Sequence, residues 1–177
     1  MKLRHIKFLH TLFQWFKNEN LSPKVPLDFS NDERIIRTVY SPFNIDRKKG
    51  TLNPNLFKSP FDIDEISVNR LNYTTANFCK KISKDNQAVG KRDYFGFAVL
   101  LKKEITNSNC SIVYSPITEP KEKINYFHSD IKVGQIAKRG EQYPSEISKK
   151  IKDLTDVARF YIDPLPTSND WTGDDLK

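Results

Sequence analysis

"RIIRTVY", Arg34 to Tyr40, is the segment from which a β-sheet is most readily predicted. It is short, rich in β-branched residues and closely followed by Pro42, which is typical of a strand that ends there. Side chains alternate between the two faces of a strand, so Ile35, Arg37 and Val39 share one face. We therefore expect a sheet that has an arginine on an apolar face.

Further strands are predicted along the chain from short segments of similar composition: Glu65 to Arg70, Tyr94 to Leu101, Ser111 to Ser115 and Phe127 to Val133. Thr74 to Lys84 is predicted as a short helix, because Phe78 and Ile82 are four residues apart.

Amphipathic helices are predicted near both ends of the chain. Residues 3–17 place Ile6, Leu9, Phe13 and Phe16 at helical spacing, and Pro144 to Tyr161 has the same pattern. The expected fold is α+β, with a mostly antiparallel sheet of about five short strands covered by these two helices.

The predicted organisation has four parts. Residues 1–20 form the N-terminal helix, which packs on its own domain or contacts a protein partner or a membrane surface. Residues 21–32 form a linker, 33–163 a single α+β domain, and 164–177 an acidic, loosely held tail. Ile6 to Phe16 is shorter than the roughly 20 apolar residues of a transmembrane helix, so we expect a cytoplasmic protein.

The charge of the chain is positive and unevenly distributed. Its 177 residues carry a net charge of +7, and the first 150 contain 26 Lys and Arg against 16 Asp and Glu. This favours an anionic partner, although it is also typical of an ordinary charged surface. Frequent Lys, Asn and Ile with few Gly suggest an AT-rich bacterial or phage genome. The predicted nucleic-acid-binding residues are Arg47, Lys48, Lys49, Lys91 and Arg92.

Two arginines are predicted on apolar strand faces, namely Arg37 and Arg70. Burying an unpaired guanidinium costs several kcal/mol, so each needs a carboxylate or an anionic ligand. Together with His128 they are candidate ligand-binding residues. The alternative is a structural role, either in a salt bridge to Asp62, Asp64 or Glu65 or with the charged end of the side chain reaching solvent at the end of a strand.

The segment "FHSDIKV", Phe127 to Val133, contains a Ser, a His and an Asp. If it is a strand, Ser129 points away from His128 and Asp130, which excludes a local catalytic triad. His128 and Asp130 then act with residues from elsewhere, or simply form the polar face of the strand. The candidate catalytic residues are Arg37, Ser67, His128 and Asp130.

Neither a metal nor a cofactor is expected from the motifs. His5 and His10 are five residues apart, which is not a same-face helical spacing, and the chain has no HExxH or CxxC motif. No GxxxxGK loop is present to bind phosphates.

The succession "RIIRTVY", "GTLNPNLF", "EISVNR", "YFGFAVLL" and "FHSDI" resembles a group of small uncharacterised bacterial proteins without an assigned activity. The resemblance covers about residues 34–160. It implies the following positions to test: Arg37, Phe57, Ser67, Val68 and His128.

A second resemblance is to the ADP-ribosyltransferases, in which an Arg on one strand, a Ser on the next and a late Glu act together. Here the corresponding residues would be Arg37, Ser67 and Glu141, although Ser67 begins "SVN" and not a Ser-Thr-Ser run. The leading expectation is an accessory, non-catalytic module of a bacterial system that binds nucleic acid or an acidic protein. The alternative is an enzyme or binding protein for a nucleotide or phosphorylated small molecule.

Overall fold

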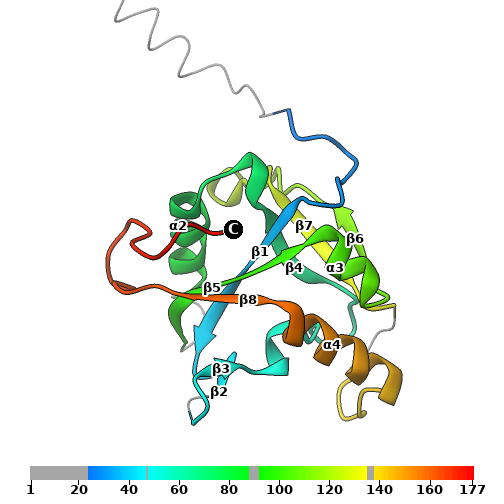
Figure 1. Ribbon diagram of the computed structural model, residues 1–177. Coiled ribbons are helices and arrows are strands. Elements are labelled where there is room, and N and C mark those ends of the chain that lie inside the picture. The colour runs from blue at the N-terminus through cyan, green and yellow to red at the C-terminus, as the bar shows by residue number, and fades with distance from the viewer. Residues whose placement is uncertain (1–23, 47, 88–91, 135–137) are drawn as a thin grey trace, which may run out of the picture.

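A six-stranded antiparallel sheet is the centre of the computed structural model, which describes residues 24–46, 48–87, 92–134 and 138–177 (Figure 1). Its strand order is β6-β7-β4-β1-β5-β8. The strands are β1 (Arg34–Ser41), β4 (Ile66–Arg70), β5 (Asp93–Leu101), β6 (Ser111–Tyr114), β7 (His128–Lys132) and β8 (Arg159–Ile162). A separate hairpin consists of β2 (Ile45–Asp46) and β3 (Thr51–Leu52). The predicted α+β class with a mostly antiparallel sheet is confirmed.

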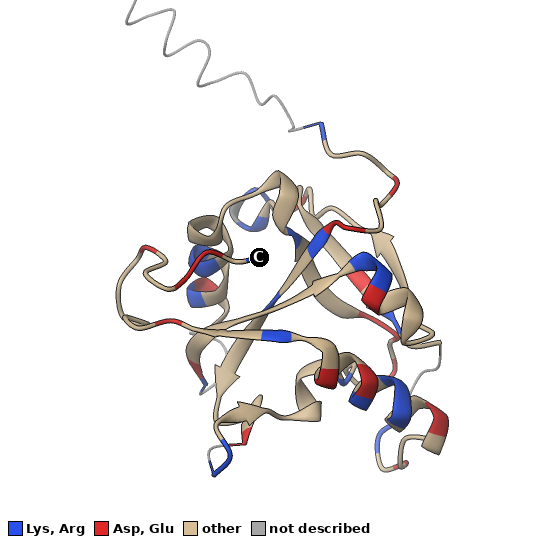
Figure 2. Ribbon diagram, in the orientation of Figure 1, with Lys and Arg blue, Asp and Glu red and all other residues tan. Residues whose placement is uncertain are grey.

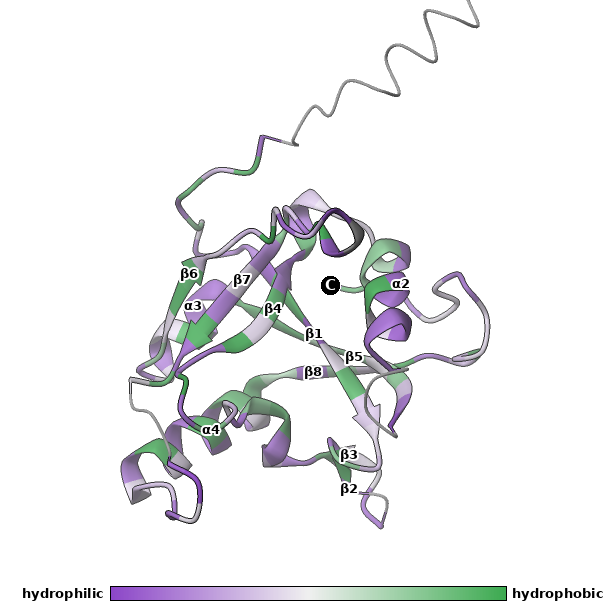
Figure 3. Cartoon of the chain, turned by 180° about the vertical axis from the view of Figure 1, so that it is seen from behind, coloured by the Kyte–Doolittle hydropathy of each residue, from purple (hydrophilic) through white to green (hydrophobic). Residues whose placement is uncertain are grey.

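Helices lie on both faces of this sheet. The described α-helices are α2 (Ala76–Gln87), α3 (Lys102–Asn107) and α4 (Ser145–Val157), and the 3-10 helices are η1 (Pro54–Phe57), η2 (Leu71–Tyr73) and η3 (Lys121–Lys123). On one face, α4 and η1 pack against a core that includes Ile35 and Ile131. On the other face, α2 packs against Ile36 and Phe97. Seen from behind, α2 lies beside β1 and β5, and no described α-helix lies over β4, β7 and β6 on this side (Figure 3).

The last strand, β8, corrects the prediction of a helix that continues to Tyr161. Helix α4 ends at Val157, and the next residues pair with β5, with Phe160 opposite Ala98 and Tyr161 opposite Phe97. Helical spacing continued through Tyr161 in the sequence, so periodicity alone could not locate the end of the helix. The aromatic residues of "RFYI" favour the strand because they gain contacts on both faces of the sheet.

Gly96 allows β8 to approach β5 closely. It lies opposite Val39 on one side and Ile162 on the other, next to a bulge in the pairing of β1 with β5. A Cβ atom at this position would lie 2.2 Å from the carbonyl oxygen of Tyr161. A backbone atom cannot move aside as a flexible side chain can, so the absence of a side chain at Gly96 keeps β8 in place.

Gly96→Ala is therefore expected to lower the free energy of unfolding by about 1–3 kcal/mol, the usual cost of overpacking, with a loss of pairing at β8. Urea titration measures this change. Gly50→Ala is the control, because nothing lies within 4 Å of a Cβ there and only its positive φ is strained. Equal destabilisation by the two variants would contradict the close-approach explanation.

The C-terminal tail, predicted to be loosely held, instead packs against α2 (Figure 1). The Lys80 amino group donates to the carbonyls of Leu165 and Asp170 at 2.9 and 2.7 Å. The Trp171 ring lies 5.1 Å from that of Phe97, and Leu176 is buried. The turn-rich composition concealed this packing, because the anchoring lysine belongs to a distant helix.

The predicted N-terminal helix, residues 1–20, lies outside the described residues, as does the start of the linker. Within the described ranges, no helix is long and apolar enough to cross a membrane.

Candidate functional site

Strands β1 and β4 separate at Arg37. They pair only at Ile35 with Arg70 and at Ile36 with Asn69, and beyond that point they diverge (Figure 3). The Arg37 guanidinium lies between them, because Nε donates to the carbonyl of Leu56 at 2.5 Å and Nη1 to that of Ser67 at 2.6 Å. The arginine therefore supplies a donor to one carbonyl of β4 and to one carbonyl of η1.

No carboxylate among the described residues is hydrogen-bonded to Arg37. Its two acceptors there are main-chain carbonyls, which carry no net charge. The pKa of Arg37 is lowered to about 10, mainly by burial and also by the positive charge of Arg92, while Tyr40 and Asp130 act in the opposite direction. The positive charge of Arg37 is thus disfavoured by its surroundings, and a bound anion would stabilise it.

Arg92 is the second arginine near this point. The pairing of Ser41 with Asp93 places it beside the end of β1, where its Cζ lies 4.2 Å from the centroid of the Tyr40 ring. Its Nε is buried and has no hydrogen-bond partner in the described part of the chain. A cation–π contact contributes only about 1–2 kcal/mol, so the guanidinium can still bind an anion.

The same end of β1 leads into an exposed hairpin that carries further basic residues (Figure 2). Lys48 and Lys49 lie in the turn between β2 and β3, where their N–H groups donate to the Asp46 carboxylate at 3.0 and 3.3 Å. Phe43, just before β2, is 55% exposed. We call Arg37, Arg92, Lys48, Lys49 and Phe43 the β1-end surface.

Two of the predicted nucleic-acid-binding residues, Arg47 and Lys91, lie outside the described residues. From the sequence, Tyr40, Phe43 and Tyr94 are all predicted to lie close to basic residues, where they could stack on bases. The structure distinguishes them, because Tyr40 and Tyr94 are buried and Phe43 is exposed.

His128 and Asp130 lie on the face of β7 that no described helix covers, and Ser67 is opposite Asp130. Their closest polar partner is Ser115, just beyond β6. Its hydroxyl donates to Asp130 Oδ2 at 2.6 Å, and its carbonyl accepts from His128 Nδ1 at 2.7 Å. Ser129 is fully buried, as expected for the opposite face of the strand.

This arrangement differs from a Ser-His-Asp triad. In a triad the carboxylate orients Nδ1 and the hydroxyl lies at Nε2. Here the Ser115 carbonyl accepts from His128 Nδ1 at 2.7 Å, and the Ser115 hydroxyl lies 3.1 Å from the same nitrogen and not at Nε2. The hydroxyl donates to Asp130 Oδ2, and Nε2 lies 3.8 Å from Asp130 Oδ1. The group holds the end of β6 against β7, and its geometry does not activate Ser115 as a nucleophile.

Arg70 has a structural role, so its prediction as a ligand-binding residue is wrong. It is completely buried, and Glu33 accepts from Nε at 2.5 Å and from Nη2 at 2.8 Å. The carbonyls of Pro26 and Asp28 accept further hydrogen bonds, and the Phe29 ring covers the guanidinium at 3.9 Å. A salt bridge was the correct alternative, but its partner is none of the three carboxylates considered, Asp62, Asp64 and Glu65.

Neither a reactive cysteine nor a metal site is found among the described residues. Burial raises the pKa of Cys79 to about 12 and that of Cys110 to about 11, so both thiols are protonated near neutral pH. Among the described residues, no three His, Cys, Asp or Glu side chains are grouped so that they could bind a metal ion.

The ADP-ribosyltransferase resemblance also lacks a shared site. Arg37 contacts the main chain of Ser67, not its side chain. Glu141 lies in an exposed turn, where its N–H donates to the carbonyl of Lys138, and no contact joins it to Arg37 or Ser67 in the described ranges. Comparison with known proteins finds no matching family model, no similar curated protein and no similar solved structure.

Proposed function

We propose that this chain is an accessory, non-catalytic module that binds single-stranded nucleic acid through the β1-end surface. The supporting observation is the charge imbalance at Arg37 and Arg92. Arg34 donates to the Asn72 side chain and the carbonyl of Leu176, while Arg70 pairs with the Glu33 carboxylate and Arg159 with that of Glu104. Neither Arg37 nor Arg92 has such a partner among the described residues, and burial already disfavours the charge of Arg37. A phosphate group would supply the missing negative charge.

The exposed aromatic ring favours a single strand over other polyanions. Proteins that bind single strands combine basic residues along the backbone with aromatic rings on which bases stack. Phe43 supplies such a ring at the base of the hairpin whose turn carries Lys48 and Lys49, and about half of its surface is exposed. Tyr40 cannot serve in this way, because it is buried beneath Arg92.

Fluorescence anisotropy with labelled single-stranded DNA and RNA at about 50 mM salt tests this proposal. Arg92→Ala is expected to weaken binding about tenfold, because it removes a charge-assisted phosphate contact. Phe43→Ala removes a stacking ring and is expected to cost about 1–3 kcal/mol of binding free energy.

The matched control is Lys152→Ala, which removes one positive charge from an exposed position on α4. It is expected to change affinity little. Equal losses in Lys152→Ala and Arg92→Ala would indicate a diffuse charge effect and contradict a defined surface. Binding of inorganic phosphate or a nucleotide without binding of either oligonucleotide would instead favour the small-molecule alternative.

A further inference from the structure

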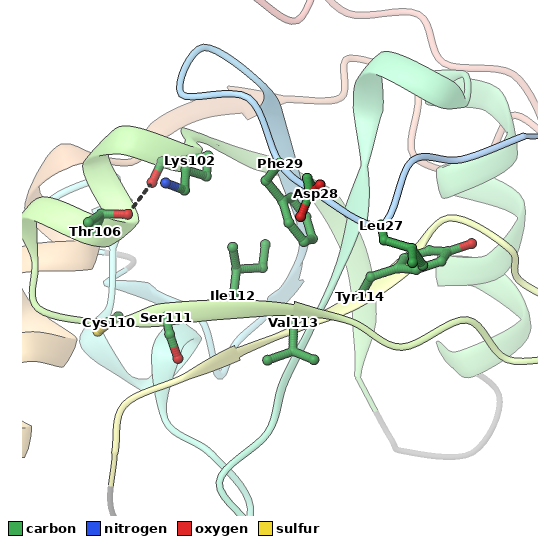
Figure 4. A pocket seen from close by; sticks show the side chains of 10 residues that line it. All are labelled: Leu27, Asp28, Phe29, Lys102, Thr106, Cys110, Ser111, Ile112, Val113 and Tyr114. Atoms are coloured by element: carbon green, nitrogen blue, oxygen red, sulfur yellow. Dashed lines mark hydrogen bonds between the residues drawn. The ribbon is translucent and has the colours of Figure 1, made fainter.

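The free edge of the sheet at β6 lies beside a surface pocket of about 590 Å³ (Figure 4). Leu27 and Phe29, from the segment before β1, form one wall. Lys102 and Thr106 of α3 form another, and Ile112 and Tyr114 of β6 form the floor. In this view Ile112 points into the pocket and Val113 points away from it. The pocket is thus apolar along the strand and polar at the α3 end.

The outward backbone groups of β6 can be assigned from its pairing with β7. The Ser115 N–H donates to the carbonyl of His128 at 3.3 Å, and the direction of these groups alternates along a strand. The N–H and C=O groups of Ser111 and Val113 therefore point toward β7, whereas those of Ile112 and Tyr114 point toward the free edge. No strand pairs with this edge in the described part of the chain.

Edge strands are normally protected by charged residues, proline or a covering element. β6 contains only Ser111, Ile112, Val113 and Tyr114, so it has neither charge nor proline. Val113 is 48% exposed and Leu27 is 78% exposed, on opposite sides of the edge. At the other edge of the sheet, β8 begins with the charged Arg159. A proline follows each edge strand at the same distance, Pro116 after β6 and Pro164 after β8, so the two edges differ in charge.

We propose that β6 binds an extended segment of a partner protein, which adds a seventh strand to the sheet and places alternate apolar side chains in the pocket. Main-chain hydrogen bonds to Ile112 and Tyr114 supply the pairing, and the pocket selects the side chains. The side chains of the segment that enter the pocket lie against Leu27. The side chains between them point to the other side of the sheet and lie beside Val113. This site is separate from the β1-end surface.

A peptide segment fits this edge better than a second copy of the chain. β6 has four residues and is therefore about 14 Å long. Pairing over that length covers far less than the roughly 800 Å² per partner that stable protein–protein interfaces bury. An added strand is held by backbone hydrogen bonds and a few side chains, so it does not need such an area.

The test uses the full chain and a fluorescent synthetic peptide in which valine alternates with threonine. The same peptide with N-methyl groups at alternate positions retains the side chains but loses the donors needed for pairing. We expect the first peptide to bind and the methylated peptide to bind at least about tenfold more weakly. Equal binding of both peptides would overturn the proposal.

Three variants locate the binding site. Leu27→Asp and Val113→Lys alter exposed side chains on the two sides of β6, so both should fold normally, and each is expected to weaken peptide binding about tenfold. Ile162→Lys is the matched control at the opposite edge, where Ile162 is 52% exposed, and it should bind normally. A loss in Ile162→Lys equal to that in Val113→Lys would contradict the proposal. A chain dimer in sedimentation that Val113→Lys dissociates would identify a second copy as the occupant and would also contradict it.

Discussion

Arg70→Met is expected to lower the free energy of unfolding by about 3–5 kcal/mol, because it leaves the Glu33 carboxylate buried without its partner. Glu33 is 1% exposed and Arg70 is completely buried. The carbonyls of Pro26 and Asp28 would also lose their donor, so the segment before β1 should detach more easily. Urea titration measures the change in stability, and proteolysis before β1 measures the detachment.

Two further variants separate the charge effect from lost packing. Arg70→Met/Glu33→Leu removes both charges, so we expect it to be more stable than Arg70→Met alone. Arg159→Met breaks the more exposed pair with Glu104 and should cost about 1 kcal/mol or less. If the double variant is less stable than Arg70→Met, the unpaired Glu33 carboxylate is not the main cause of the lost stability.

Lys80→Met is the second change with a large expected effect, again about 3–5 kcal/mol. Lys80 and Asp163 are both buried, and their charged atoms lie 2.7 Å apart. Lys80 also donates to two carbonyls of the tail, so the variant should release the tail from α2. Lys81→Met is the neighbouring control, because its pair with Asp85 is exposed and worth little.

The pH dependence of Lys80→Met should differ from that of the wild type. Burial alone raises the pKa of the Asp163 carboxyl, but hydrogen bonds from Lys80, Thr172 and the Leu165 N–H outweigh it, so the net pKa is lowered. In the wild type, the ionised Asp163 carboxylate therefore contributes fully to stability above the pKa of about 4 that it has in the unfolded chain. This contribution is lost as the pH falls through its lower pKa in the folded protein. In Lys80→Met, protonation of the unpaired Asp163 carboxylate removes its buried charge and so stabilises the variant. The free energies of unfolding of the wild type and the variant should therefore converge in acid. A constant difference between pH 7 and pH 3 would contradict this account.

Local sequence patterns were sufficient to predict five of the strands, since alternation and β-branching report on a single segment. They placed Arg37 and Arg70 on apolar faces for the same reason and could not distinguish them. The difference is tertiary, because the fold brings the Glu33 carboxylate into hydrogen-bond distance of Arg70, whereas the hydrogen bonds of Arg37 to described residues go to main-chain carbonyls. Strand order, which determines that Ser115 meets His128 and that β6 is an edge, also depends on contacts between distant segments.

The candidate surface was partly predictable. Basic residues near residues 47–49 and at Arg92 were recognisable from composition, but their common position depends on the pairing of Ser41 with Asp93. That register is shifted by the bulge between Val39 and Tyr40, which no local pattern predicts. The stacking of Arg92 on Tyr40, which removes that ring from ligand binding, follows from the same geometry.

The most direct test of the nucleic-acid proposal is the salt dependence of wild-type affinity for a single-stranded oligonucleotide. The four basic residues of the β1-end surface predict that the logarithm of the association constant falls with the logarithm of salt concentration with a slope of about −3. Arg92→Ala should make this slope less steep, by the amount that one phosphate contact contributes. Measurable binding at about 50 mM salt with that slope would support the proposal. The absence of binding to both DNA and RNA under those conditions would contradict it.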